Sequence, residues 1–351
     1  MIWSKRYEAE VTFSGAMVVD DNGNVYITGG TLSGKSDETM DYVTIKYDAE
    51  GEQSWVSRYD GGGLDQSIAM TLDSNGNVYV TGQSAKNQFA STYDYATVKY
   101  DNNGFELWAV RYKTPEESGY GASSIALDEF GNVYVSGVAG TIKYDQWGKQ
   151  LWVNDSDTLD IRDVYQPKLG LVLDEKGNSY VLRNTSLVKY SPDGKRLWGA
   201  DSIKSSGTNA ILHTVALDRD SNVYIAGWIE NKPNTGKPGY HSYTAKYNTY
   251  GEQLWMALYQ PEADCNTVAK AMLIDEAGGV YIAGTSCNRY LTIKYDHDGN
   301  KIWTSQFKDP NPEASASGKT IALDDHKNVY ILGNSYVPDD RYYVTIVKYS
   351  Q

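Results

Sequence analysis

Hydrophobic and polar residues alternate along most of the chain in short segments that end at turn residues. Residues 67–72 (SIAMTL) lead through a D-x-x-G-N turn into residues 78–82 (VYVTG). Residues 97–100 (TVKY) lead through a D-x-x-G turn into residues 105–112 (FELWAVRY). Alternation with a period of two predicts half-buried strands, and Asp followed by Gly predicts tight hairpins. Because no segment keeps a 3.6-residue periodicity, the sequence predicts an all-β protein.

This four-strand unit occurs seven times along the chain. An Asn-Val-Tyr motif or a close variant recurs every 44 to 57 residues and ends at Tyr26, Tyr79, Tyr134, Tyr180, Tyr224, Tyr281 and Tyr330. Each motif follows a turn Asp and precedes a Lys-Tyr pair. Four-stranded units at this period are typical of propeller blades. We therefore predict a seven-bladed β-propeller of four-stranded blades, with residues 1–351 as a single domain.

The two ends of the chain share one repeat. In six units a Trp follows the Lys-Tyr pair, but the seventh unit ends at Gln351 before reaching its Trp. Residues 3–7 (WSKRY) match residues 55–59 (WVSRY) and 108–112 (WAVRY). We therefore expect residues 3–7 to form the outer strand of the seventh blade, beside residues 347–349, and so to close the ring.

Composition and charge exclude several kinds of partner. The formal net charge of −13 opposes nucleic-acid binding, which needs clustered Lys and Arg. The chain has no run of 18 apolar residues, so we expect no membrane span. Residues 1–15 contain no apolar core of a signal peptide, so none is expected at this end.

The repeated pattern resembles a known family. A turn Asp, Gly-Asn-Val-Tyr and Thr-Gly occur at residues 72–82 (LDSNGNVYVTG), and Lys-Tyr-Asp with a Gly turn at residues 97–104 (TVKYDNNG). In these motifs the chain resembles the SBBP family of β-propeller repeats over essentially its whole length. The family is bacterial and often extracellular or cell-surface, so the resemblance implies an extracellular, cell-surface or periplasmic location. Because the family is mostly uncharacterised, the resemblance implies no particular reaction.

A second likeness, to repeats of quinone-dependent dehydrogenases, rests on D-x-x-G-x-x-x-W at residues 48–55. Such an enzyme needs a cofactor over the propeller axis and a metal beside it. The sequence offers no ligand set for either, so we expect no cofactor and no metal.

Cys265 and Cys287 flank the first hairpin of the sixth blade. The register set by the turn at residues 275–279 places Thr267 opposite Cys287 and Cys265 diagonal to its partner. The extracellular leaning of the SBBP resemblance favours a disulfide, which requires Cα atoms within about 7 Å.

Residues that repeat in every blade are expected to be structural. The Lys before each Tyr is predicted to hold its amine over an aromatic ring or near the turn Asp.

The D-x-x-G hairpins of one face differ little between blades, so that face is expected to lack a pocket.

Departures from the repeat are better candidates for binding. The loops between second and third strands are long in blades one, two, five and seven and short in blades three and four, and such loops commonly carry binding residues. Arg183 replaces a Gly of the other six blades. Basic residues stand five positions before the turn Asp in blades five, six and seven, and the long loop of blade five carries aromatic residues. The predicted ligand-binding residues are Arg183, His213, Trp228, Tyr240, His241, Lys270 and Lys319.

Structural interpretations of these residues stay open. The basic residues could be separately solvated, Arg183 could be an exposed cap of a short loop, and the aromatic rings could pin their loop instead of stacking on a sugar.

No G-x-S-x-G, H-E-x-x-H, Walker or dinucleotide-binding motif is present, which leaves open only enzymes whose site is assembled from separate blades. We expect a non-catalytic binding or scaffolding module that engages a glycan or protein, with an anionic partner among the candidates, as a monomer or as a subunit of a complex. An alternative is a polysaccharide lyase, with Arg183 neutralising a uronate, His241 as base and Tyr240 as acid. A subunit of a larger complex would instead show an apolar patch.

Overall fold

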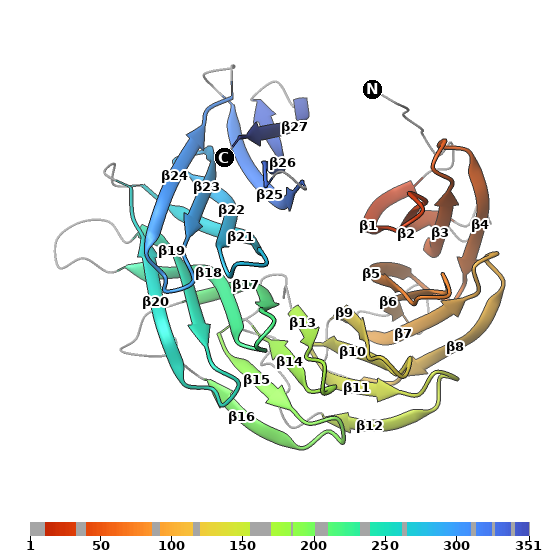
Figure 1. Cartoon of the computed structure of the whole chain (residues 1–351). Coiled ribbons are helices and arrows are strands. Elements are labelled where there is room, and N and C mark those ends of the chain that lie inside the picture. Colours follow the sequence, from red (N-terminus) through yellow and green to blue (C-terminus); the bar gives the residue numbers. More distant parts are fainter. Residues whose placement is uncertain are drawn as a thin grey trace. The chain divides into compact units, whose positions relative to one another are not determined.

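Every regular element in the described part of the chain is a β-strand. The computed structural model describes residues 11–32, 40–85, 92–114, 120–154, 170–183, 185–200, 210–231, 239–261, 265–309, 314–324, 327–337 and 341–350. These residues form seven antiparallel sheets, and no helix occurs among them (Figure 1). The predicted all-β class and the repeated blades are therefore confirmed. No segment of the described residues forms a helix long and apolar enough to cross a membrane.

The chain divides into two compact units, which we describe separately. Unit 1 comprises residues 1–178 and 191–195, and unit 2 comprises residues 179–190 and 196–351. The strands of unit 1 are β1 (Val11–Val19), β2 (Val25–Leu32), β3 (Met40–Tyr47) and β4 (Gln53–Tyr59) in sheet 1; β5 (Asp65–Leu72), β6 (Val78–Ala85), β7 (Tyr93–Tyr100) and β8 (Glu106–Tyr112) in sheet 2; β9 (Ala122–Leu127), β10 (Val133–Gly137), β11 (Gly140–Tyr144) and β12 (Gln150–Asn154) in sheet 3; and β13 (Gly170–Leu173) of sheet 4.

Unit 2 carries the remaining strands. They are β14 (Ser179–Leu182), β15 (Leu187–Tyr190) and β16 (Arg196–Ala200) of sheet 4; β17 (Ala210–Leu217), β18 (Val223–Asn231), β19 (Gly239–Tyr247) and β20 (Gln253–Tyr259) in sheet 5; β21 (Thr267–Ile274), β22 (Val280–Ser286), β23 (Arg289–Tyr295) and β24 (Lys301–Phe307) in sheet 6; and β25 (Ser315–Leu323), β26 (Val329–Val337) and β27 (Arg341–Tyr349) in sheet 7.

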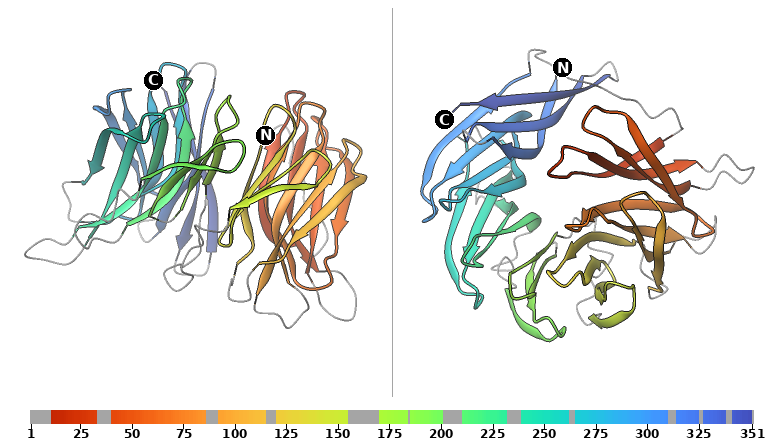
Figure 2. Two further views of the ribbon diagram at one scale, coloured as in Figure 1. Left: turned by 90° about the horizontal axis from the view of Figure 1, so that it is seen from below. Right: turned by 45° about the vertical axis from the view of Figure 1, so that its right-hand side comes forward.

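Strands follow one another in chain order across each sheet, so every connection within a sheet is a hairpin (Figure 2). Sheet 7 has three strands among the described residues. Residues 3–7, which carry the predicted closing strand, lie outside the described residues, so closure of the ring stays a prediction.

At the first hairpin of all seven sheets the turn Asp accepts backbone hydrogen bonds as predicted. The predicted glycine with positive φ is present in five of these turns, and Ser221 and Lys327 take its position in sheets 5 and 7. In sheet 2 the carboxylate of Asp73 accepts hydrogen bonds from the backbone N–H groups of Asn75 and Asn77 at 2.9 and 3.0 Å. Gly76 completes the turn with φ +76°, a conformation that L side chains rarely adopt. The Tyr79 hydroxyl donates to the same carboxylate at 3.0 Å.

The predicted structural role of the repeated lysines is also confirmed. In all seven sheets the ammonium group lies 4.6 to 5.0 Å from the centroid of the motif tyrosine, as Lys99 does over Tyr79. Lys246 in addition pairs with the turn carboxylate of Asp218 at 3.2 Å. Each amine thus lies over a ring face, and the Lys348 side chain keeps 52% of its surface exposed.

Neighbouring sheets within a unit share their core. Tyr26 and Tyr42 of sheet 1 pack with Met70, Val78 and Val80 of sheet 2. The same arrangement recurs between sheets 5 and 6.

In five of the sheets a tryptophan joins the sheet to the next one. The indole N–H donates to a backbone carbonyl in the turn between the third and fourth strands of the following sheet, at 2.9 to 3.0 Å. A glycine of that turn lies flat on the indole. We call this arrangement a tryptophan seat, and it occurs at Trp55, Trp108, Trp152, Trp198 and Trp255.

The second and third strands of sheets 3 and 4 are short, and the turns that join them are tight. β10 and β11 meet in a tight turn at Gly137–Gly140, and β14 and β15 meet at Arg183–Ser186. The strands at these positions have four or five residues, against seven to nine in the other sheets. The low loops predicted for blades three and four are therefore confirmed.

Candidate functional site

A β-bulge interrupts the first strand of six sheets at one repeated position. The extra, unpaired residue is the fifth before the turn Asp in every case. The bulged residues are Gly15, Ile68, Ser123, His213, Lys270 and Lys319. A bulge kinks the strand and redirects the side chain of the extra residue, and bulges are common beside binding sites.

The glycine opposite each bulge explains why the bulge repeats. A Cβ atom at Gly82 would lie 2.1 Å from the carbonyl oxygen of Gln66, and one at Gly227 would lie 2.0 Å from that of Ile211. The kinked strand therefore approaches the second strand too closely for any side chain. In sheet 4 the described strands end at Leu182, and Arg183 takes the glycine position in a turn of its own.

Unit 2 brings three bulged basic residues onto neighbouring strands. β17, β21 and β25 lie side by side in that order (Figure 1). His213 and Lys270 are partly exposed and Lys319 is exposed. The Lys270 ammonium donates to the hydroxyl of Ser317 on the next strand at 2.6 Å. We call His213, Lys270 and Lys319 the basic row; unit 1 has Gly15, Ile68 and Ser123 at the same positions.

The aromatic residues predicted in sheet 5 pack against each other. The rings of Trp228 and Tyr240 lie 4.3 Å apart between centroids and are inclined by 55°. Asn266 accepts a hydrogen bond from the Tyr240 backbone N–H at 2.9 Å. The ring contact holds the two strands of the pair together. Because Tyr240 keeps 38% of its surface exposed, the pair also presents part of an aromatic ring to solvent.

Two other predicted site residues are buried. Arg183 is 2% exposed and His241 is 7% exposed. The interpretation of Arg183 as an exposed loop cap is therefore wrong, because its side chain points into the protein. In this conformation neither Arg183 nor His241 offers its polar group to a ligand arriving from solvent.

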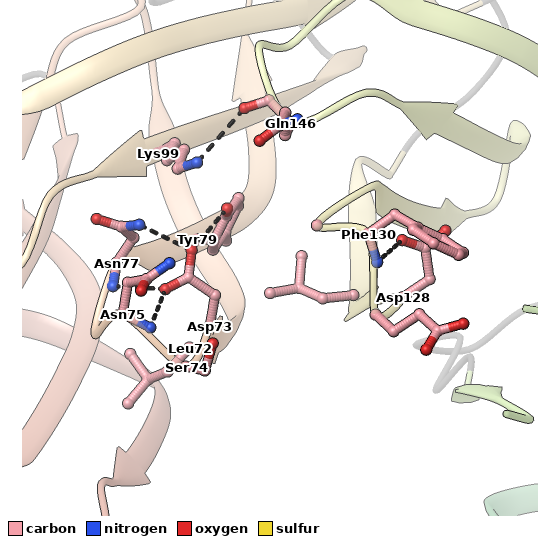
Figure 3. Close-up of a pocket in the computed structure, with 13 residues that line it drawn as sticks. Leu72, Asp73, Ser74, Asn75, Asn77, Tyr79, Lys99, Asp128, Phe130 and Gln146 are labelled. Carbon is pink, nitrogen blue, oxygen red and sulfur yellow. Dashed lines mark hydrogen bonds between the residues drawn. The ribbon is translucent and has the colours of Figure 1, made fainter.

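The hairpin side of unit 1 holds a hollow of about 480 Å³ between the turns of sheets 2 and 3 (Figure 3). Asp73, Asn75, Lys99, Phe130 and Gln146 contribute to its lining. The expectation that this side lacks a pocket is therefore wrong, because adjacent turns leave a space even where each turn is short.

Most polar groups of this hollow already bind one another. Lys99 donates to the Gln146 carbonyl oxygen at 3.4 Å, and burial lowers the pKa of the Lys99 ammonium. The Asp128 carboxylate accepts from the backbone N–H groups of Phe130 and Asn132. The hollow is thus a by-product of the repeat, with the exposed Phe130 ring as its distinctive feature.

A group of carboxylates in unit 1 was not recognised from the sequence. One oxygen from each of Asp41, Asp60 and Asp65 lies within 4.8 Å of the others, and within the described ranges no other such group of His, Cys, Asp or Glu occurs. This spacing suits a cation. Asp41 lies in β3 of sheet 1, Asp60 follows β4, and Asp65 begins β5 of sheet 2. Asp94 of sheet 2 matches Asp41 in the repeat, but the three carboxylates come from separate segments, so no local motif marks the group.

Burial shapes the chemistry of this group. Burial, with a smaller contribution from the nearby Asp41, raises the pKa of Asp65 to about 6. Hydrogen bonds from the Ser84 hydroxyl and the Gly61 N–H, together with the charge of Arg111, act in the opposite direction.

Cys265 and Cys287 are joined by a disulfide bond with 5.4 Å between Cα atoms. The predicted register was wrong by one residue, because Thr267 faces Ser286 instead of Cys287. The bulge at Lys270 is the cause, since its extra residue shifts the rest of β21 against β22.

Comparisons with known proteins support the fold. No family model and no curated protein matches the chain. Among solved structures, a protein from Lactobacillus plantarum is 13% identical with a TM-score of 0.55, covering 93% of this chain and 96% of its own. The Neurospora crassa Pan2 WD40 domain is 11% identical with a TM-score of 0.52, covering 96% and 91%.

A polysaccharide lyase described as an ulvanlyase is 12% identical with a TM-score of 0.53, covering 99% of this chain and 81% of its own. A second ulvanlyase structure, bound to -[GlcA(1-4)Rha3S]-, matches with a TM-score of 0.52. Similarity at this level of identity concerns the fold alone, and the fold it shows is that of a β-propeller.

Proposed function

We propose that the protein is a non-catalytic binding module whose basic row recognises an anionic ligand, a carboxylated or sulfated glycan in the first instance. The observation that carries this proposal is the repeated bulge, because it places basic residues at one strand position in three successive sheets. A structural requirement alone does not explain the bases, since Gly, Ile and Ser serve at the same position in unit 1.

Electrostatics gives the row its selectivity. The chain has a net charge of −13, so its overall field repels anions. A local group of cations can capture an anion only by direct contact and short-range attraction, because charges more than about 10 Å apart are largely screened in physiological salt. We therefore infer recognition of particular acidic groups instead of general binding of polyanions.

The Trp228–Tyr240 pair adds a surface suited to a sugar. Aromatic faces and edges pack against the C–H groups of pyranose rings, while polar side chains bind the hydroxyl and acid groups. A ligand that spans sheet 5 could use both. The ulvanlyase complex gives a precedent on a similar fold for an acidic saccharide ligand.

A polysaccharide lyase is the second candidate, and the two ulvanlyase structures favour it. In this chain the proposed base His241 and the proposed neutraliser Arg183 are both buried. Catalysis would require a conformational change that exposes them, which makes binding without cleavage the simpler proposal.

One experiment separates the two functions. The purified chain is applied to an array of neutral, carboxylated and sulfated oligosaccharides, and every bound compound is then incubated with the protein and followed by ultraviolet absorbance of the unsaturated uronate that a lyase releases. We expect binding of acidic compounds without new absorbance. Absorbance that grows with protein concentration and disappears in His241→Ala would instead establish a lyase, and an array without acidic compounds bound would contradict the binding proposal.

An extracellular, cell-surface or periplasmic location is part of this proposal. The disulfide supports it, because structural disulfides persist mainly in oxidising compartments.

A further inference from the structure

Both hairpin turns of sheet 3 present an exposed aromatic residue directly before the turn glycine. Phe130 in the first turn keeps 71% of its surface exposed, and Trp147 in the second keeps 73%. The two turns are neighbours, since a Cβ on Gly131 would lie 3.6 Å from the Cβ of Gln146. Sheet 3 therefore offers two aromatic surfaces to solvent on its hairpin side.

The fold does not require an aromatic residue at this position. The first turns of sheets 2 and 3 share one geometry, with φ +76° at Gly76 and +75° at Gly131. A ring that stays in water adds little to the stability of a fold, because only buried apolar surface stabilises it. In the other turns of unit 1 the residue before the glycine is polar, at Asn22, Glu50, Asn75, Asn103, Lys176 and Asp193. Phe130 and Trp147 are thus departures from the repeat that packing does not explain.

The Phe130 ring borders the hollow of about 480 Å³ between sheets 2 and 3. Asp73 and Tyr79 stand on one wall, and Asp128 and Phe130 stand on the wall that faces it (Figure 3). The space itself follows from the repeat, but the ring at its rim does not. The volume of the hollow lies within the range of small-ligand sites, roughly 300 to 1,000 Å³. Every residue of the lining belongs to a described strand or turn of these two sheets.

Three polar side chains at the hollow are open to a ligand. Ser74, Asn75 and Glu129 are exposed, and their side chains form no hydrogen bond within the described residues. They offer a hydroxyl, an amide and a carboxylate, so together they can donate to and accept from the hydroxyl groups of a ligand. The lining thus combines an aromatic ring with free hydrogen-bonding groups.

Charge restricts the ligand further. Asp73, Asp128 and Glu129 place three carboxylates at the hollow, whereas Lys99 carries the one ammonium group of the lining. That ammonium group is held over the Tyr79 ring, 4.8 Å from its centroid. The excess of negative charge therefore disfavours a carboxylated or sulfated ligand.

We propose that this hollow is a binding site for a saccharide without acidic groups. A pyranose has an apolar C–H face for the Phe130 ring and hydroxyl groups for Ser74, Asn75 and Glu129. An apolar ligand would instead remove water from these polar side chains without replacing its hydrogen bonds. Trp147 offers a second ring to a ligand of several sugar units. The site does not rest on the basic row, which belongs to other strands in unit 2.

The test uses the full chain carrying Lys270→Ala and Lys319→Ala, so that the basic row does not contribute. Fragments of neutral glucans, mannans and galactans and of chitosan are titrated in by calorimetry, beside carboxylated and sulfated fragments. We expect at least one neutral or amino-bearing fragment to bind, and no acidic fragment to bind more tightly. The affinity for that fragment should be the same in the chain that keeps both lysines.

Phe130→Ala should weaken binding of that fragment about fivefold or more, because the sugar loses its aromatic contact. Asn75→Ala should weaken it about threefold or more through the loss of hydrogen bonds. Phe105→Ala is the matched control, since Phe105 keeps 70% of its surface exposed beside the second turn of sheet 2 but does not line the hollow. A set of fragments of which none binds would overturn the proposal, as would equal affinities of the Phe130→Ala and Phe105→Ala variants.

Discussion

The indole N–H of Trp55 donates a hydrogen bond to the carbonyl oxygen of Asn102, 3.0 Å away in the next sheet of unit 1. The bond fixes the turn that carries Gly104 against the face of the same ring. One side chain therefore supplies both a packing surface and a polar contact between two sheets. This dual use accounts for tryptophan, instead of phenylalanine, at the repeated position.

The fit of glycine on the indole can be measured with a matched pair. Gly104 and Gly76 both lie in turns of sheet 2 with positive φ, +85° and +76°. A Cβ at position 104 would lie 2.7 Å from Trp55, whereas one at position 76 would have its nearest neighbour at 3.5 Å. We expect Gly76→Ala to cost about 1 to 2 kcal/mol of unfolding free energy, and Gly104→Ala at least about 1 kcal/mol more. Equal losses in denaturant unfolding would show that the ring contact is unimportant.

The repeated part of the fold was predictable because its determinants are local. Asp73, Asn77 and Tyr79 act within seven residues of one another, so the hairpin they form can be read from a single segment. The lysine position follows because side chains at the same register of paired strands must meet, as Lys99 meets Tyr79.

The bulge and the acidic group were not predictable in this way. The bulged position carries Gly, Ile, Ser, His or Lys, so the residue type at that position does not predict a bulge. The repeated glycine on the opposite strand is the feature of the sequence that could have predicted it. Asp41 and Asp65 meet only through the packing of one sheet on the next.

The basic row provides a test of ligand charge. Replacing Lys270 and Lys319 together by Ala should weaken the best acidic oligosaccharide by about 1 to 3 kcal/mol and reduce the salt dependence of its binding, because two charged contacts are lost. Calorimetric titration at two salt concentrations measures both effects. The exposed lysines at positions 149 and 195, replaced together by Ala, serve as the control. If neither double variant changes the binding, the basic residues are separately solvated side chains and not a ligand site.

The disulfide should contribute to stability and leave no free thiol. The bond between Cys265 and Cys287 closes a loop with a sequence separation of 22, for which chain entropy gives about 3 kcal/mol. Reduction should lower the melting temperature of the native chain but not that of the double Cys→Ser variant. Two thiols titrated in denatured, non-reduced protein would contradict the bond.

Closure of the ring by the N-terminal strand remains a prediction with a direct test. Deleting residues 1–7 removes a tryptophan and a full strand, so we expect a loss of several kcal/mol of unfolding free energy. Deleting residues 1 and 2 alone is the control, because it keeps the Trp3–Tyr7 motif. An unchanged melting temperature after the longer deletion would rule out the closing strand.

Asp65 gives the protein an unusual pH dependence. Because burial raises its pKa to about 6, the folded state binds a proton more tightly than the unfolded state, in which an Asp titrates near 3.9. Between about pH 4 and pH 6 the folded state therefore holds more protons, and its stability falls as the pH rises through this window. Above it, the carboxylate is charged while buried beside Asp41 and Asp60, with Arg111 as the nearby cation.

We expect this group to lower the unfolding free energy by about 1 to 3 kcal/mol between pH 4 and pH 7, in proportion to the difference between the two pKa values. Asp65→Asn should flatten that change, and it keeps an oxygen that can accept from the Gly61 N–H. The control Glu50→Gln, at an exposed position, should leave the pH dependence of the unfolding free energy unchanged. Urea unfolding at half-unit pH steps measures the slope for each variant. A slope that is the same in wild type and Asp65→Asn would show that this carboxyl titrates normally in the folded protein.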